Sequence, residues 1–410
     1  MSTTKPNWVT VWTASAQGAY PVGSTIGQPD LSKAIPRPEK GLVNQSFRMP
    51  FKPAIAANKF RFRISNVFGT QTLRLKDLAV SLHLGGGALV PGSRVEISDM
   101  AIEAGTTAWT EGIELRSMHQ GAVIPATDRA LIFSGWVEGE SGPITWHAKA
   151  LVTSYLSKPN TRVDRDNYSE LAFPFSTTSV FYLDAVDADV PNNCHAIVAF
   201  GDSLTDGTFT TLNGFDRWPD VLQRLLISKG QSDVAVLNAG IGGNQVLSPM
   251  SIHEPWRGGP AAIERLERDV LSLSGIRTVV WLEGINDFSD NGNAMLEDVK
   301  GGMTQVVQRL RAAGIRVIGA TLPSAFKSTR QGHGHPLQNE KRKALNQFIL
   351  TSGLLDAVAD IDQVLTNSAT GCLDALFDSD STLGGPSDGL HPNRAGHAAM
   401  ANEIWRAITQ

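Results

Sequence analysis

Hydrophobic and polar residues alternate in short stretches through the first part of the chain. In Phe60–Ile64 the apolar residues fall on one face and Arg61 and Arg63 on the other, a period of two that is typical of a half-buried strand. Similar stretches recur up to about residue 183, separated by clusters of Gly, Pro, Asn and Asp. Short strands divided by such turn signals predict an antiparallel sandwich or barrel. We therefore expect an all-β, sandwich- or jelly-roll-like domain over residues 1–190.

Two segments of this part show no clear strand pattern. Residues 14–55 are rich in Pro and Gly, which favours an extended loop over core strands. Residues 184–193 (DAVDADVPNN) have the composition of a linker. We therefore place the domain boundary between residues 190 and 191.

After this boundary, short apolar stretches alternate with amphipathic ones. The pattern predicts strands at 196–200, 234–237, 278–282, 317–322 and 357–361, and helices at 218–228, 261–273, 296–312, 340–350 and 394–408. Such alternation indicates βαβ units and an α/β domain over residues 191–410, with a parallel sheet covered on both faces. Ligands of such sheets bind beyond the carboxyl ends of the strands, so residues that directly follow a strand are candidates for a functional site.

The composition of the chain argues against several classes of protein. The 410 residues include 36 Lys+Arg and 40 Asp+Glu, a net charge of −4, so we expect no nucleic-acid partner and no attraction to anionic membranes. No stretch approaches the roughly 20 apolar residues that span a bilayer. The N-terminus has no apolar segment after Lys5, which favours a cytoplasmic protein, with secretion left open if a signal was removed. The two cysteines, Cys194 and Cys372, exclude a disulfide scaffold but leave one pairing open.

Four short segments carry residue types that catalysis uses. Three directly follow predicted strands and the fourth precedes the last predicted helix: Gly201–Gly207 with Ser203, Asn238–Asn244, Glu283–Asp287 with Asn286, and Asp388–Asn393 with Asp388 and His391. Each segment alone is more typical of a turn, a helix cap or a solvated loop. Together they supply a serine nucleophile, a histidine base, a carboxylate to orient the imidazole, and further hydrogen-bond donors. Acyl transfer needs this set of groups.

No cofactor and no metal ion is expected. Gly240 and Gly242 fit the first two positions of a dinucleotide-binding fingerprint, but Gln245 stands at the third. His333 and His335 lie in a glycine-rich loop without a cysteine or an obvious carboxylate partner, so a substrate-contacting loop is favoured over a metal site.

In these four segments the chain resembles the SGNH hydrolases, also called GDSL esterases and lipases. The resemblance covers about residues 195–410 and includes, in order, Gly201–Leu204 (GDSL), Asn238–Gly243 (the glycine block), Gly284–Asp287 (GxND) and Asp388–His391 (DxxH). Residues 217–220 and 62–69 are similar, more weakly, to larger members that carry an N-terminal β domain.

The resemblance implies a flavodoxin-like three-layer fold for the second domain and a serine esterase that acts through an acyl-enzyme. It implies Ser203 as the nucleophile, His391 as the general base and Asp388 as its orienting partner. It also implies an oxyanion hole made by the Ser203 N–H, the Gly243 N–H and the Asn286 side chain, with Gly240 as the rival to Gly243. The implied substrate is a small-molecule or acylated-carbohydrate ester with a short acyl or O-acetyl group.

Two other interpretations stay open. In the first, the β domain binds carbohydrate and the hydrolase domain is vestigial. In the second, Ser324 and Lys327 form the Ser-x-x-Lys pair of another class of serine acyl enzymes, although one such tetrapeptide is expected by chance in a chain of this length. The acyl chain length, the alcohol part of the substrate, the role of the β domain and the oligomeric state are not determined by the sequence.

Overall fold

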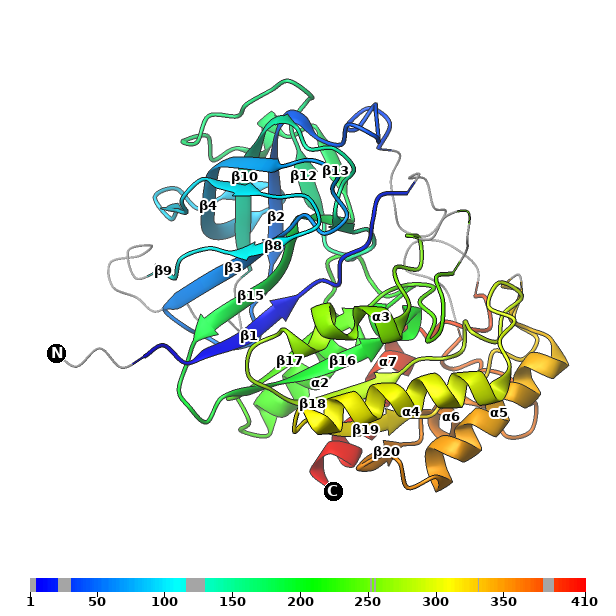
Figure 1. Cartoon of the computed structure of the whole chain (residues 1–410). Coiled ribbons are helices and arrows are strands. Elements are labelled where there is room, and N and C mark those ends of the chain that lie inside the picture. Colours follow the sequence, from blue (N-terminus) through cyan, green and yellow to red (C-terminus); the bar gives the residue numbers. More distant parts are fainter. Residues whose placement is uncertain are drawn as a thin grey trace. The chain divides into compact units, whose positions relative to one another are not determined.

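The computed structural model describes residues 5–20, 31–115, 130–250, 253, 256–330, 332–378 and 387–410. The chain divides into two compact units, Met1–Cys194 and His195–Gln410 (Figure 1). Cys194 and Cys372 do not form a disulfide. Among the described residues, no helix has the length and apolar character needed to cross a bilayer.

The first unit contains two main antiparallel sheets. In one sheet the order is β1 (Trp8–Thr13), β15 (Leu183–Asp189), β3 (Lys59–Ser65) and β8 (Thr107–Trp109), and β9 (Ile113–Glu114) also pairs with β3. In the other sheet the order is β13 (Phe175–Thr177), β12 (Ser154–Leu156), β2 (Val43–Phe51), β10 (Leu131–Glu140), β4 (Leu73–Gly85) and β5 (Ala88–Leu89). Strands β6 (Val95–Glu96) and β7 (Met100–Ile102) extend along β4, and β11 (Trp146–His147) pairs with β14 (Val180–Phe181).

An aromatic core joins these two sheets. Phe62 of β3 contacts Phe51 of β2 and Phe133 of β10, with ring centroids 6.0 and 5.4 Å apart. All three rings are buried. Two sheets that bury aromatic side chains between their faces form a sandwich, so the prediction of an all-β domain is confirmed.

The expectation of an extended loop over residues 14–55 is wrong for its second half. Strand β2 occupies Val43–Phe51 and pairs with β10 on one side and β12 on the other. The strand was not predicted because it contains polar residues, which are buried here by partners far along the chain. Gln45 Nε2 donates to Ser157 O at 2.6 Å, and Arg48 Nη1 donates to Gly87 O at 2.6 Å. Residues 21–30 lie outside the described residues.

The expected linker at 184–193 is also wrong over most of its length. Residues Leu183–Asp189 form β15, which pairs with β1 and β3. Two of the three aspartates that suggested a linker are buried and neutralised by arginines of β3, since Asp184 contacts Arg63 at 2.6 Å and Asp187 contacts Arg61 at 2.7 Å.

The second unit is built on a parallel sheet. Its order is β17 (Val234–Gly240), β16 (His195–Gly201), β18 (Ile276–Leu282), β19 (Arg316–Ala320) and β20 (Ala357–Ala359). The first strand in sequence is second in the sheet, which is the flavodoxin-like order. The chain therefore reverses direction across the sheet at β16, where this fold places its ligands.

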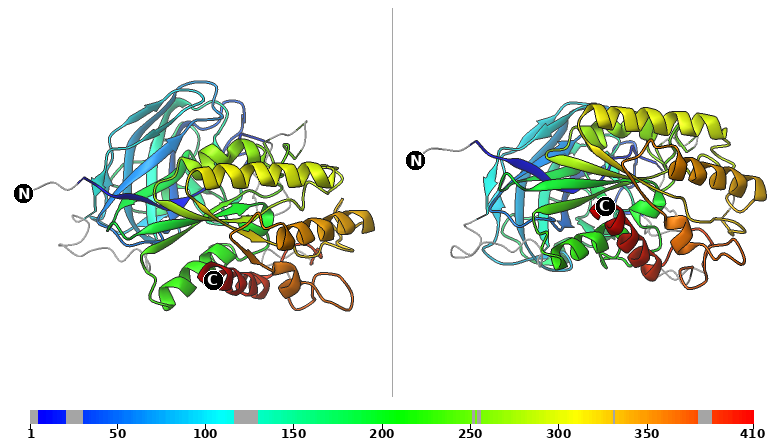
Figure 2. Two further views of the ribbon diagram at one scale, coloured as in Figure 1. Left: turned by 60° about the horizontal axis from the view of Figure 1, so that its bottom comes forward. Right: turned by 90° about the horizontal axis from the view of Figure 1, so that it is seen from below.

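Helices cover both faces of this sheet. One face carries α2 (Trp218–Ser228) and α7 (Arg394–Thr409), and the other carries α3 (Ala262–Leu266), α4 (Leu296–Ala312) and α5 (Pro336–Thr351) (Figure 2). Two short helices, α1 (Ser203–Asp206) and α6 (Ile361–Leu365), follow β16 and β20. The three-layer α/β prediction is confirmed. One expected helix, 261–273, is instead divided into α3 and a π-helical turn at Glu267–Leu271.

Candidate active site

Ser203 lies on a sharp turn between strand and helix. Strand β16 ends at Gly201, and Asp202 begins α1 with its Oδ1 accepting the Leu204 N–H at 2.9 Å. The helix ends after one turn at Gly207, whose φ of +95° suits glycine. This turn places Ser203, 7% exposed, at the carboxyl end of β16, the second strand of the sheet.

The loop before α7 brings a histidine and a carboxylate to this serine. His391 Nε2 lies 2.8 Å from Ser203 Oγ, and His391 Nδ1 lies 2.7 Å from Asp388 Oδ2. The other carboxylate oxygen, Oδ1, accepts the backbone N–H groups of Leu390 and His391 at 3.0 and 2.9 Å. Because the carboxylate holds Nδ1–H, Nε2 is left to accept a proton from the serine.

The surroundings keep Asp388 ionised. Burial alone would raise its pKa, but the contact with His391 and the N–H donors of His391 and Leu390 outweigh burial and lower the pKa to about 2. The guanidinium of Arg330 also contacts the same carboxylate, with Nε 3.1 Å from Oδ2. The ring of Phe209 meets the imidazole of His391 edge-on, with centroids 5.4 Å apart.

Three glycines lie at the end of β17 and in the turn that follows it, and their N–H groups differ in availability. The Gly240 N–H donates to Asn238 Oδ1 at 2.9 Å, and the Gly242 N–H donates to Asp206 Oδ2 at 2.9 Å. Within the described residues, the Gly243 N–H has no acceptor. Gly243 therefore has an N–H that a ligand can use, and Gly240 does not.

Asn286 follows β18 and is held beside this turn. Its Nδ2 donates to Asn244 O at 2.9 Å, and the residue is 6% exposed. The neighbouring Asp287 accepts the N–H groups of Val246 and Leu247, at 2.9 and 3.2 Å, and so fixes the chain that follows the glycine turn. Burial raises the pKa of Asp287 to about 7 despite these donors.

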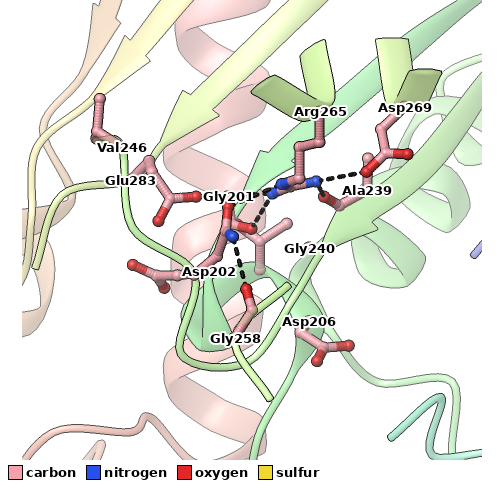
Figure 3. A network of polar contacts seen from close by, with 12 residues as sticks. Gly201, Asp202, Asp206, Ala239, Gly240, Val246, Gly258, Arg265, Asp269 and Glu283 are labelled. Atoms are coloured by element: carbon pink, nitrogen blue, oxygen red, sulfur yellow. Dashed lines mark hydrogen bonds and ion pairs between the residues drawn. The ribbon is translucent and has the colours of Figure 1, made fainter. Parts of the chain in front are cut away.

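The buried side chain of Arg265 binds the ends of two strands next to this site (Figure 3). The Arg265 guanidinium, fully buried, donates to four groups: Gly201 O at 2.9 Å, Ala239 O at 2.8 Å, Asn244 Oδ1 at 2.8 Å and Asp269 Oδ2 at 3.0 Å. One side chain thus holds the end of β16, the end of β17 and the glycine turn together. Arg265 was not among the residues predicted from the sequence. The signal was an Arg–Asp pair at i and i+4, Arg265 and Asp269, beside the apolar residues Leu266 and Val270.

Two further buried carboxyl groups lie near Arg265. Glu283 Oε2 is 3.8 Å from Arg265 Nη2, and neither oxygen of Glu283 has a hydrogen-bond partner among the described residues. Burial and the neighbouring Asp202 raise the pKa of Glu283 well above its ordinary value. Burial also raises the pKa of Asp202 to about 7.

The structure thus brings together Ser203, His391, Asp388, Asn286 and the Gly243 turn. It does not bring Ser324 into a comparable arrangement, because the Ser324 hydroxyl is buried and donates to Gly371 O at 2.6 Å.

Of the two loop histidines, His333 reaches the site and His335 does not. His333 Nε2 lies 3.0 Å from Asn286 Oδ1, whereas His335 is exposed at the start of α5. Within the described residues, no group of three His, Cys, Asp or Glu side chains is placed to hold a metal ion. Arg330, which contacts Asp388, was missed by the sequence analysis. A lone arginine in a loop carries no signal of such a contact.

Several solved structures are similar to about half of this chain. They include Est24, a carbohydrate acetylesterase from Sinorhizobium meliloti, at 15% identity and a TM-score of 0.39, covering 52% of this chain and 98% of that one. The acetyl xylan esterase AlAXEase matches at 20% identity and a TM-score of 0.38, with 52% and 99% covered. An aryl esterase of M. smegmatis matches at 16% identity and a TM-score of 0.39, with 53% and 99% covered.

A search of curated proteins found no match to this sequence. Residues 199–399 match the GDSL-like Lipase/Acylhydrolase family, and this range contains all four segments described above. The chain therefore contains a GDSL-like Lipase/Acylhydrolase domain over residues 199–399.

Proposed function

We propose that this protein is a serine esterase that hydrolyses carboxylic esters with short acyl groups, including O-acetyl groups on carbohydrates. The observation that carries the proposal is the chain of contacts from Ser203 Oγ to His391 Nε2 at 2.8 Å and from His391 Nδ1 to Asp388 Oδ2 at 2.7 Å. A serine hydroxyl is a weak nucleophile until a base removes its proton, and His391 Nε2 is within reach of that proton while Asp388 orients the imidazole.

In the first half of the reaction, Ser203 Oγ attacks the ester carbonyl carbon while His391 Nε2 takes the hydroxyl proton. The negative charge that develops on the carbonyl oxygen is stabilised by the N–H groups of Ser203 and Gly243 and by Asn286 Nδ2–H. The bond to the alcohol oxygen then breaks, and His391 gives its proton to that oxygen. Ser203 is left as an acyl ester.

In the second half, water takes the place of the alcohol. His391 removes a proton from water as its oxygen attacks the acyl carbon, and the same donors hold the oxyanion. The bond to Ser203 Oγ breaks, Oγ recovers the proton from His391, and the carboxylic acid leaves. Asp388 stays ionised throughout, as its pKa of about 2 requires near neutral pH.

A small cavity lies close to Asn286. Its lining includes Ile285, which precedes Asn286, His333, which contacts Asn286, and the rings of Phe288 and Phe326. Its volume is about 10 Å³, and a space of roughly this size holds a single water molecule. Neither Ser203 nor His391 lines this cavity, so the acyl-chain series below decides the acyl length.

A carbohydrate-binding protein with a decayed hydrolase domain is the alternative. Such a protein has no need for a hydrogen-bonded serine, histidine and carboxylate, or for an unused N–H at Gly243. The retained arrangement therefore favours the esterase.

The test compares the wild type with Ser203→Ala on p-nitrophenyl esters from acetate to decanoate and on acetylated xylan. We expect Ser203→Ala to lower kcat by more than about 10³-fold, and the wild-type kcat/KM to fall as the acyl chain lengthens. Ser324→Ala is the control and should keep the wild-type rate. Undiminished turnover by Ser203→Ala, or a loss confined to Ser324→Ala, would overturn the proposal.

A further inference from the structure

The loop between β19 and α5 places an imidazole on the side-chain amide of Asn286. His333 Nε2 is 3.0 Å from Asn286 Oδ1, and the His333 side chain is half-buried. Among the described residues, no other hydrogen bond reaches this oxygen, whereas the amide nitrogen of the same side chain donates to Asn244 O at 2.9 Å. The oxygen and the nitrogen of the Asn286 carboxamide thus each form a hydrogen bond with a different loop.

These two contacts determine the orientation of the amide. The Asn244 carbonyl oxygen can only accept, so the Asn286 nitrogen must face it and the Asn286 oxygen must face His333. An amide oxygen also only accepts, so His333 Nε2 must carry the hydrogen of this contact. One Nδ2–H of Asn286 is used by Asn244, and the other stays available for a substrate oxygen.

An asparagine side chain needs such support because its terminal torsion is broad and roughly two-fold. Without a partner on Oδ1, the carboxamide can turn about that torsion and carry its free N–H away from the position where negative charge develops. Loss of one oxyanion donor typically lowers kcat by about 10²–10³-fold. A partial loss of the amide's orientation should lower kcat by a smaller factor.

The loop that carries His333 is itself tied to the rest of the site. Its Thr329 N–H donates to the Asp388 carbonyl oxygen at 2.9 Å, and Arg330 Nε lies 3.1 Å from Asp388 Oδ2. At its other end, the Gly332 carbonyl oxygen accepts the N–H of Asp290, four residues after Asn286, at 3.1 Å. The loop is therefore anchored both to the carboxylate that orients His391 and to the segment that carries Asn286.

We propose that His333 is a positioning residue, which fixes the Asn286 carboxamide so that its free Nδ2–H points at the developing oxyanion. The inference rests on the proposed esterase function and adds a residue to its machinery. It predicts an effect on kcat and not on KM, because an oxyanion donor acts mainly in the transition state.

The experiment measures kcat and KM on p-nitrophenyl acetate for His333→Ala, His333→Gln and the control His335→Ala. We expect His333→Ala to lower kcat about 10-fold with KM within twofold of the wild type. His333→Gln should recover most of the loss, because its amide nitrogen can donate from near the Nε2 position. His335→Ala, in the same loop but exposed, should match the wild type.

A double-mutant cycle separates an action through Asn286 from a general effect on the fold. Asn286→Ala alone should lower kcat by about 10²–10³-fold. If His333 acts through Asn286, adding His333→Ala to Asn286→Ala should lower kcat no further. A thermal unfolding midpoint recorded for each variant identifies any that fails to fold, and His333→Gln then serves as the test.

Three outcomes would overturn the inference. The first is an unchanged kcat in His333→Ala, the second is an equal loss in the Asn286→Ala background, and the third is a change in KM alone, which would instead indicate a substrate contact. Full activity of Ser203→Ala in the same assay would overturn the proposed function itself, and the inference with it. Activity that requires Ser203 but not His333 contradicts only the inference.

Discussion

Two buried aspartates near the nucleophile have opposite pKa shifts, and their hydrogen bonds explain why. Asp388 receives two backbone N–H groups and the imidazole, and its pKa falls to about 2. Asp202 receives one backbone N–H on Oδ1, while its Oδ2 has no partner among the described residues. Burial therefore dominates, and the pKa of Asp202 rises to about 7. The same site thus contains an ionised carboxylate, Asp388, and a carboxyl group that is readily protonated, Asp202.

Asp202→Asn should make the free energy of unfolding less dependent on pH. The folded pKa of Asp202 lies above that of an unfolded aspartate, so the folded state keeps a proton that the unfolded state releases between about pH 4 and pH 7. Wild-type stability from this group therefore falls as pH rises through that window, by at most about 4 kcal/mol at 1.4 kcal/mol per pKa unit. Asparagine keeps the Oδ1 acceptor for the Leu204 N–H and removes the charge.

Urea unfolding at pH 5 and pH 8 measures this difference. The variant should gain stability relative to the wild type as pH rises, whereas Asp298→Asn, an exposed site on α4, should show no such trend. A constant difference between Asp202→Asn and the wild type at both pH values would refute the assigned shift.

At the scale of elements, the site depends on how the ends of β16 and β17 are held. Parallel strands leave carbonyl groups unpaired where the chain departs into a turn, and buried carbonyl groups need partners. Arg265, which projects from α3, supplies N–H groups to Gly201 O and Ala239 O, and Asp269 neutralises its charge. The helix that covers the sheet thereby also shapes the turn that carries Ser203.

Arg265→Met should lower the free energy of unfolding by about 3–5 kcal/mol, since it leaves two buried carbonyl groups and the Asp269 carboxylate without this partner. The control is Arg406→Met, whose side chain is 67% exposed and pairs with Glu403 on α7. That surface pair should contribute at most about 1 kcal/mol. Urea unfolding at pH 7 gives both values, and equal losses in the two variants would contradict the role given to Arg265.

At the scale of the whole molecule, the sequence predicted the second unit better than the first. The helices at 218–228 and 296–312 appear at the expected residues, because their apolar faces repeat with the helical period. In the first unit, β2 and β15 were missed because their buried polar residues have partners far along the chain. Asp184 and Arg63, for example, are 121 residues apart.

In the candidate site, too, local patterns predicted some residues, while contacts between distant segments could not be predicted. Ser203, Asn286, Asp388 and His391 stand in short segments with a fixed order, so a local pattern revealed them. Arg330, and the contact that His333 makes with Asn286, depend on the path of one loop between β19 and α5. The path of a loop produces no periodic pattern in the sequence, so these contacts could not be predicted from it.

The central claim is that Ser203 is the nucleophile of an esterase, and covalent labelling of the full chain tests it most directly. A fluorophosphonate forms a bond from its phosphorus to an activated serine oxygen and releases fluoride, and mass spectrometry of the digested protein then locates the label. We expect one label per chain, on Ser203, and a large loss of labelling rate in His391→Ala. A label on Ser324, or a wild-type chain that stays unlabelled at Ser203, would contradict the account.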